Sequence, residues 1–278
     1  MPITKKLQIA LIISAGIVVF IALNLFLLSI GLNKITAVVI PLLSLSITAL
    51  WLNFIFNAGF DPWSDIVLNK QNKLVALTFD DGPSSNFTEK ILTVLKEKKV
   101  PASFFVLGKK LSNNINLAEE LLKNNCEIGA HTYAHKKLHR SSSSKIDNEI
   151  QKSLSLVKKL YQNVGLIAEY KPIFRAPHGF KSLRLKIYTK KNKIKLIPWT
   201  RGVWDTDSPG ADWIFNMATK NPKKMEIILL HDGLGLENKK DDKQVLGLLD
   251  ALPRIIDFYK NKGYSFVKVS KFINKNKP

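Results

Sequence analysis

From residue 73 onward the chain alternates short apolar runs with longer amphipathic runs, and this alternation limits the possible folds more than any other feature. Short apolar runs are typical of buried strands, and apolar residues spaced three or four apart are typical of helices. Strands that alternate with helices predict a parallel sheet with right-handed crossovers. The runs interpreted as strands are Leu74–Phe79, Ser103–Leu107, Glu127–Gly129, Ile173–Arg175, Ile194–Trp199, Glu226–His231 and Ser265–Val269.

The amphipathic runs fill the gaps between these strands. In the first of them Ile91, Val94 and Leu95 recur at helical spacing, and Val100-Pro101 ends the run. Seven strands favour a barrel, closed or incomplete, over an open sheet. The predicted helices are Asn86–Lys98, Leu117–Asn125, Ser144–Tyr161, Ser182–Lys190, Ala211–Ala218 and Gln244–Lys260.

The first 59 residues differ in kind from the rest. Neither Leu7–Leu32 nor Ile35–Ala58 contains a charged side chain, so each run is long enough to cross a bilayer core of ~30 Å as a helix. We predict a membrane anchor with two transmembrane helices over residues 1–59, a linker over 60–72 and one catalytic domain over 73–278. One span followed by an interfacial helix is the alternative, and a signal peptide is disfavoured because its apolar region is shorter.

This organisation predicts a multi-pass protein of the bacterial cell membrane. A two-span hairpin puts the N-terminus and the domain on the same side. Lysines near the span ends are more frequent on that side than in the loop, so the positive-inside rule slightly favours the cytoplasmic face for the domain. These lysines are Lys5, Lys6, Lys70 and Lys73, against Lys34 in the loop.

The chain is strongly basic, with 42 Lys and Arg against 22 Asp and Glu and a net charge of +20. Such a charge favours anionic partners, such as an anionic lipid surface, a phosphorylated lipid carrier or an acidic polymer. Nucleic acid is not expected, because no basic stretch is interleaved with aromatic residues. Cys126 is the only cysteine, which excludes an intramolecular disulfide and a cysteine-based metal site.

Acidic, basic and histidine side chains fall where the predicted strands end. In a parallel β/α barrel the carboxyl ends of the strands form one face, and active sites lie on that face. Residues far apart in the chain would therefore converge there. They are Asp80, Asp81, His131, His135, Arg175, Asp205 and His231.

Two adjacent aspartates and a pair of histidines have the pattern of a hydrolytic metal site. Asp80 and Asp81 point to opposite sides of an extended segment, so one can bind an ion while the other faces the reacting water. His131 and His135 are four residues apart, and a helical turn would bring both imidazoles to one ion. With Asp81 they would leave positions open for water and substrate. An ordinary Asp-Gly turn and two surface histidines are the alternative.

Four short motifs occur in order: Thr78-Phe79-Asp80-Asp81-Gly82, His131-Thr132-Tyr133-Ala134-His135, Arg175-Ala176-Pro177-His178-Gly179 and Leu229-Leu230-His231-Asp232. Their order and spacing resemble those of the polysaccharide deacetylase family, whose shared unit is the NodB homology domain. The likeness runs from about residue 70 to residue 270. It implies an irregular (β/α)7 barrel, here preceded by the transmembrane hairpin. It also implies a metal-dependent hydrolase that removes an N-acetyl group from an amino sugar.

By this resemblance Asp81, His131 and His135 hold a divalent metal. Zinc is the ion expected first, with cobalt, nickel and manganese as alternatives. The acetylated sugar would lie against the third and fourth motifs. The residues implied to contact it are Pro177, His178, Gly179, Leu229 and Leu230. For the two leucines, at an apolar strand end, a place in the core is an equally good interpretation.

The same resemblance implies an acid and a base. Asp80 would be the general base, and Arg175 would pair with it and keep it ionised, because a neighbouring cation lowers the pKa of a carboxyl. His231 would be the general acid that protonates the leaving amine.

Two features depart from the family pattern. Family members commonly carry Tyr where this chain has His178, at a position whose backbone N–H is the expected oxyanion donor. The aspartate–tryptophan motif is also divided between Asp205, Asp207 and Asp212. One of these carboxylates should hydrogen-bond to His231, and Asp205 is favoured, then Asp207, then Asp212.

The expected substrate is an N-acetylated glycan of the cell envelope or a polyprenyl-linked amino sugar. A catalytically inactive, membrane-anchored carbohydrate-binding or scaffold protein is the main alternative, and it would have lost one of the chemical residues. A peptidase-like hydrolase would carry Glu between its paired histidines, where this chain has Thr132.

Overall fold

The computed structural model describes residues 72–273, except 86, 208–209, 234–235 and 237–245, and residues 22, 25–26, 39, 42–43 and 46. The chain divides into two compact units, Met1–Asp61 and Pro62–Pro278. Most of the first unit, with most of the predicted membrane anchor and linker, lies outside the described residues.

The localisation prediction needs correction. Among the described residues, no helix is both long and apolar enough to cross a membrane. The multi-pass membrane protein predicted from the two uncharged runs is therefore not supported. The prediction that the domain lies on the cytoplasmic face depended on those spans and is not supported either. Lack of charge over a sufficient length is a necessary condition for a span, but it does not by itself establish one.

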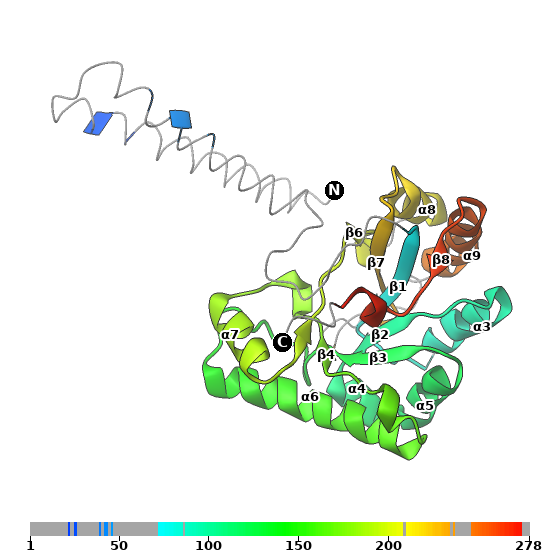
Figure 1. Ribbon diagram of the computed structural model, residues 1–278, viewed down its shortest axis with the longest axis horizontal. Coiled ribbons are helices and arrows are strands. Elements are labelled where there is room, and N and C mark those ends of the chain that lie inside the picture. The colour runs from blue at the N-terminus through cyan, green and yellow to red at the C-terminus, as the bar shows by residue number, and fades with distance from the viewer. Residues whose placement is uncertain are drawn as a thin grey trace. The chain divides into compact units, whose positions relative to one another are not determined.

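A parallel sheet forms the centre of the second unit (Figure 1). The eight strands are ordered β5-β4-β3-β2-β1-β7-β6, and β8 pairs with the beginning of β1. They are β1 (Leu74–Asp80), β2 (Ser103–Val106), β3 (Glu127–Ala130), β4 (Ile173–Phe174), β5 (Lys195–Leu196), β6 (Arg201–Gly202), β7 (Met225–His231) and β8 (Ser265–Phe266).

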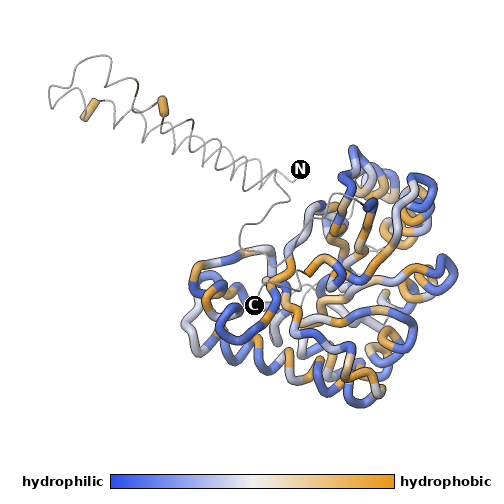
Figure 2. Tube along the Cα trace, viewed as in Figure 1, coloured by the Kyte–Doolittle hydropathy of each residue, from blue (hydrophilic) through white to orange (hydrophobic). Residues whose placement is uncertain are grey.

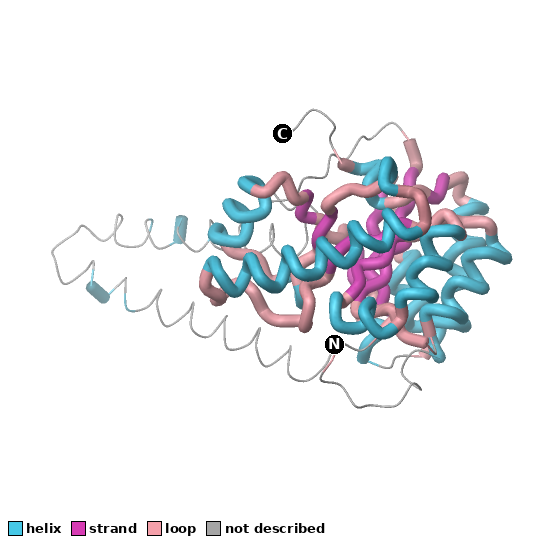
Figure 3. Tube along the Cα trace, turned by 90° about the horizontal axis from the view of Figure 1, so that it is seen from below, coloured by secondary structure: helices cyan, strands magenta, loops and turns pink. Residues whose placement is uncertain are grey.

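Helices surround this sheet (Figure 3). The longest described helix begins where the Ser142 hydroxyl accepts a hydrogen bond from the Lys145 N–H, as serine does at a helix N-cap. The helices are α3 (Thr88–Lys98), α4 (Gly108–Asn113), α5 (Ile115–Lys123), α6 (Ser143–Asn163), α7 (Leu183–Lys191), α8 (Ala211–Thr219) and α9 (Leu246–Asn261). Short 3-10 turns are η1 (Ile167–Glu169), η2 (Pro177–Gly179), η3 (Asp205–Asp207) and η5 (Val269–Phe272).

The core lies on both faces of the two longest strands, β1 and β7. Apolar residues dominate both strands (Figure 2), because one face packs on helices and the other on side chains inside the half-barrel, so neither faces solvent. The rings of Phe79 and Phe104, on neighbouring strands, stack with their centroids 4.9 Å apart. This packing holds the carboxyl end of β1 in a rigid part of the molecule.

The predicted parallel β/α architecture is confirmed, but the seven-stranded barrel is wrong in detail. Of the predicted strand Ile194–Trp199 only β5 forms, and a separate short strand, β6, follows after Pro198, which cannot donate a hydrogen bond to a sheet. In the part of the chain that the structure describes, β5 and β6 lie at opposite ends of the strand order and do not pair with each other. The sheet is therefore an open half-barrel.

Candidate active site and metal centre

The predicted chemical residues lie together at the carboxyl ends of the strands. Asp80 is the last residue of β1 and His231 the last of β7, and their Cα atoms are partners in the sheet register. His131 directly follows β3, and Arg175 directly follows β4. The topology of the sheet thus brings four distant parts of the chain to one edge.

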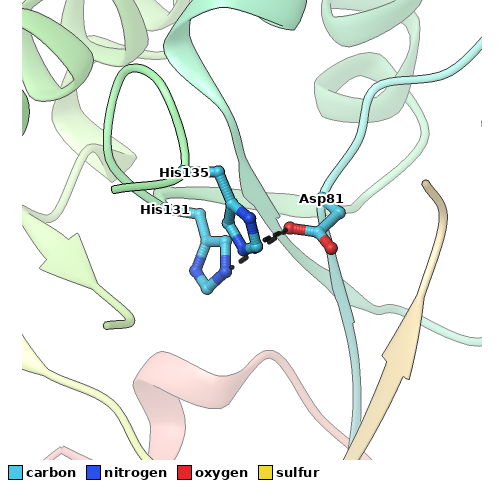
Figure 4. Close-up of side chains that lie close together, drawn as sticks. All are labelled: Asp81, His131 and His135. Carbon is cyan, nitrogen blue, oxygen red and sulfur yellow. Dashed lines mark ion pairs between the residues drawn. The ribbon is translucent and has the colours of Figure 1, made fainter. Parts of the chain in front are cut away.

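Asp81, His131 and His135 form a compact group of possible metal ligands. One possible ligand atom from each lies within 4.8 Å of the others. The Asp81 Oδ1 atom is 3.6 Å from the His131 Nε2 and 3.2 Å from the His135 Nε2. Figure 4 shows both imidazole rings turned toward the carboxylate.

The chemistry of this group fits a divalent ion. The Asp81 Oδ1 is buried and accepts no hydrogen bond from the residues that the structure describes, which is costly for a carboxylate unless a cation is nearby. The His131 Nδ1 lies 2.9 Å from the Arg175 carbonyl oxygen, so it donates its proton there and leaves the Nε2 lone pair for a metal. Burial also holds the pKa of His131 well below its usual range, which favours the neutral, ligating imidazole.

The loop that carries the two histidines is not the helical turn predicted from their spacing. Thr132 has φ 69° and His135 has φ 55°, so both lie in the left-handed region. A β-branched residue rarely adopts this conformation, which therefore has to be stabilised by contacts outside the loop. The side chains converge because of this backbone shape, and not because of helical periodicity.

Two elements hold the loop in place. The N–H groups of Gly108 and Lys109, at the start of α4, donate to the carbonyl oxygens of Thr132 and Tyr133, at 3.0 and 2.9 Å. From α6, one carboxylate oxygen of Glu149 accepts the N–H groups of Tyr133 and Ala134, at 3.0 and 2.8 Å.

Sequence reasoning missed Glu149. Its side chain is buried in the protein, and nothing in the sequence pattern distinguished it from the other acidic residues.

We expect Glu149→Ala to weaken binding of a divalent ion by about 10- to 100-fold, the range for residues that orient metal ligands. Two loop N–H groups would lose their acceptor, and the histidines would no longer be held for one ion. Glu149→Gln keeps an oxygen in the same place and should retain most of the affinity. Asp147→Ala is the matched control on α6, because Asp147 contacts Tyr188 and not the loop. A competition titration with a chromophoric chelator measures the effect, and tight binding by Glu149→Ala would contradict this role.

Asp80 is buried and paired with Arg175. The guanidinium Nη1 donates to the Asp80 Oδ1 at 2.8 Å and to the Thr78 hydroxyl at 2.8 Å. Burial raises the pKa of Asp80 to about 6, although the Arg175 charge acts to lower it. Arg175 thus pairs with Asp80 and lowers its pKa as expected, but desolvation of the buried carboxylate, which the sequence did not indicate, is the larger effect.

His231 is held by Asp205. The Asp205 Oδ1 lies 2.8 Å from the His231 Nδ1, and its Oδ2 accepts the His231 backbone N–H at 2.8 Å. Burial acts to lower the pKa of His231, but the charge and hydrogen bond of Asp205 outweigh it and raise the pKa to about 9. Of the other two aspartates considered, Asp207 is exposed and Asp212 pairs with Arg254.

Two further polar contacts, not predicted from the sequence, support the aspartate segment. The Lys110 ammonium donates to the Asp81 carbonyl oxygen at 2.8 Å. The Asp232 N–H donates to the Asp80 carbonyl oxygen at 3.0 Å, and its carboxylate accepts from the Thr88 hydroxyl at 2.6 Å. In the sequence, the only sign of this role of Asp232 is its position beside His231 in the fourth motif.

The residues implied to contact substrate differ in exposure: some reach the surface and others are buried. His178 is exposed and left-handed, with φ 57°, and it lies in η2 between the buried Pro177 and Gly179. Leu229 is partly exposed, whereas Leu230 is fully buried in the core. Leu230 is therefore a core residue, and the prediction that it lines the substrate site is not supported by its position.

The comparisons with known proteins agree with this geometry. Residues 68–197 match the family described as polysaccharide deacetylase. A peptidoglycan-N-acetylglucosamine deacetylase of Bacillus cereus is 31% identical, over 77% of this chain and 93% of that protein. The chain belongs to the polysaccharide deacetylase family.

Other relatives within the family extend this result. A solved peptidoglycan N-acetylglucosamine deacetylase has a TM-score of 0.64 and 31% identity, covering 74% of this chain and 90% of that chain. A chitooligosaccharide deacetylase of Rhizobium leguminosarum is 28% identical over 65% of this chain and 80% of that protein. The predicted family and enzyme class are thus confirmed. Asp81, His131 and His135 provide a possible site for the metal on which polysaccharide deacetylases depend.

Proposed function

We propose that this chain hydrolyses the N-acetyl group of N-acetylglucosamine units in a glycan. The main support is one observation: a buried carboxylate and a histidine with a raised pKa lie on paired strands beside the Asp-His-His group. The names of the relatives, which act on peptidoglycan or chitooligosaccharides, support this substrate class. An inactive carbohydrate-binding protein would not need this set of residues to be complete.

In this proposal Asp81, His131 and His135 hold the ion. When bound, a divalent ion would supply Lewis-acid polarisation of the amide carbonyl and lower the pKa of a water. Zinc is the ion that we propose, because two imidazoles and one carboxylate with open positions suit it.

Asp80 is the proposed general base. As a carboxylate it takes a proton from the attacking water while Arg175 holds its other oxygen and fixes its orientation. The backbone N–H of His178 is the proposed donor to the developing oxyanion.

His231 is the proposed general acid. It carries a proton at Nε2 because Asp205 accepts the proton on Nδ1 and stabilises the imidazolium. It gives this proton to the amine nitrogen as the carbon–nitrogen bond breaks, and acetate and a free amino sugar result.

The direct test is mass spectrometry of N-acetylglucosamine oligomers and of peptidoglycan fragments incubated with the purified full chain and zinc. We expect a mass loss of one acetyl exchanged for hydrogen at each modified sugar, with release of an equal amount of acetate. A protein with full metal occupancy that changes neither substrate would exclude the proposed reaction.

The state of His231 gives a pH prediction. We expect kcat/KM to fall as the pH rises through about 9, where His231 loses the proton that it must donate. Asp205→Asn removes the negative charge that raises this pKa, so the alkaline limb should move to lower pH. Asp212→Asn, an exposed control, should leave the limb in place. A pH profile of the Asp205→Asn variant identical to that of the wild type would contradict the assignment of His231 as the acid.

A further inference from the structure

Aromatic rings form a continuous row from the metal centre to the protein surface. The ring centroids of His135 and His178 are 4.6 Å apart, those of His178 and Phe180 are 5.9 Å apart, and those of Phe180 and His139 are 4.7 Å apart. The row begins at a possible metal ligand and ends at residues that the proposed reaction does not use.

The backbone of the third motif places this row. His178 and Gly179 are both left-handed, with φ 57° and 70°, so the chain turns sharply after Pro177 and presents Phe180 outward. Gly179 lies against the Trp199 ring, with which a Cβ atom would clash, so the packing of this ring fixes the turn. Phe180 is 45% exposed, although a phenylalanine of the core would be buried.

The other end of the row adds a polar group. The Nδ1 atom of His139 is buried and has no hydrogen-bond partner in the described structure. A buried polar atom without a partner is uncommon, and a ligand would reach this one only if the imidazole turned, because the atom has no exposed surface. The row therefore offers the exposed ring of Phe180 and, beside it, the exposed imidazole of His178.

These are the groups that recognise a pyranose ring. A sugar ring has faces of C–H groups that pack on an aromatic face, and hydroxyl groups at its edge that need polar partners. We propose that Phe180, flanked by His178 and His139, binds a second sugar of the glycan, next to the sugar that is deacetylated at the metal centre. This inference rests on the proposed function, and it assigns to Phe180 a role in substrate binding that is separate from the chemistry.

The alternative is that this surface binds a protein partner through its exposed apolar side chains. Leu183 and Ile187, on the following helix α7, are 62% and 58% exposed. A protein partner could cover them together with Phe180. A sugar, in contrast, would pack on the Phe180 ring and not on the aliphatic side chains. Replacement of Leu183 is therefore the matched control for replacement of Phe180.

The test compares three variants of the full chain, with zinc, on the tetramer of N-acetylglucosamine. We expect Phe180→Ala to raise KM by about three- to tenfold, the range of a single aromatic contact, with kcat changed by less than about twofold. The contact is to a sugar that does not react, so it lowers the energy of bound substrate and transition state equally. Phe180→Tyr keeps the ring and should behave as wild type, as should Leu183→Ala.

A binding measurement separates this inference from the proposed function. Calorimetry gives the Kd of the same tetramer for Asp80→Asn and for Asp80→Asn with Phe180→Ala, and we expect the second Kd to be larger by the same factor as KM. If the Phe180 change leaves both KM and Kd unaltered, or if Leu183→Ala has an equal effect, the subsite is wrong. If the wild type releases no acetate while Phe180→Ala still weakens binding, the subsite stands and the proposed reaction fails.

Discussion

Replacement of Asp80 by asparagine is expected to lower kcat by about 10²- to 10⁴-fold while the protein still binds one divalent ion. Asparagine has the shape of aspartate, and its carbonyl oxygen can accept the hydrogen bond from Arg175 that Asp80 now accepts. It cannot take a proton from water. Asp81, His131 and His135 are unchanged, so loss of turnover would come from loss of the base and not from loss of the metal.

The control for this variant is its fold and its metal content. Arg175 is buried, and removing the charge beside it lowers stability, so the unfolding temperature and the metal-to-protein ratio have to be measured with kcat. A folded, metal-loaded Asp80→Asn protein with the kcat of the wild type would mean that another residue is the base.

Replacement of His135 by alanine is expected to remove the ion itself and, with it, the activity. One of three ligands is lost, so we expect the Kd for zinc to rise more than about a hundredfold, beyond the effect of residues that only orient ligands. Treatment of the wild type with a chelator should give the same loss of turnover, reversed by added zinc.

His231→Ala is the comparison that separates a ligand from an acid. It should lose turnover as His135→Ala does, but it should keep the affinity for zinc, because His231 is not in the Asp-His-His group. Equal loss of zinc affinity in both variants would place His231 among the ligands, and unchanged affinity in His135→Ala would remove that residue from them.

The positions of the chemical residues could be predicted because strand ends are recognisable. In a parallel sheet the carboxyl ends share one edge, so Asp80, His131 and His231 had to meet if the apolar runs before them were strands. Leu230 was assigned to the substrate site by resemblance, with a place in the core as the equal alternative, and its side chain is buried in the core.

The features that sequence reasoning missed depend on tertiary contacts. The left-handed shape of the histidine loop is stabilised by Glu149 from a helix that begins later in the chain, and no local pattern encodes that contact. The net shift in the pKa of Asp80 depends on how completely the core excludes water, so the neighbouring Arg175 alone did not predict it. The strand Ile194–Trp199 was predicted from apolar residues without regard to Pro198.

The pairing of β1 with β7 has a consequence for how this enzyme can diversify. Asp80 and His231 are register partners at the end of seven consecutive pairs, so their separation is fixed by backbone hydrogen bonds and not by loops. Phe180 and the proposed histidine ligands, in contrast, lie on loops beyond the strands. Insertions or substitutions in those loops can change which glycan is accepted without moving the proposed proton donor relative to the proposed proton acceptor. Substrate range and proton transfer can therefore evolve as nearly independent traits.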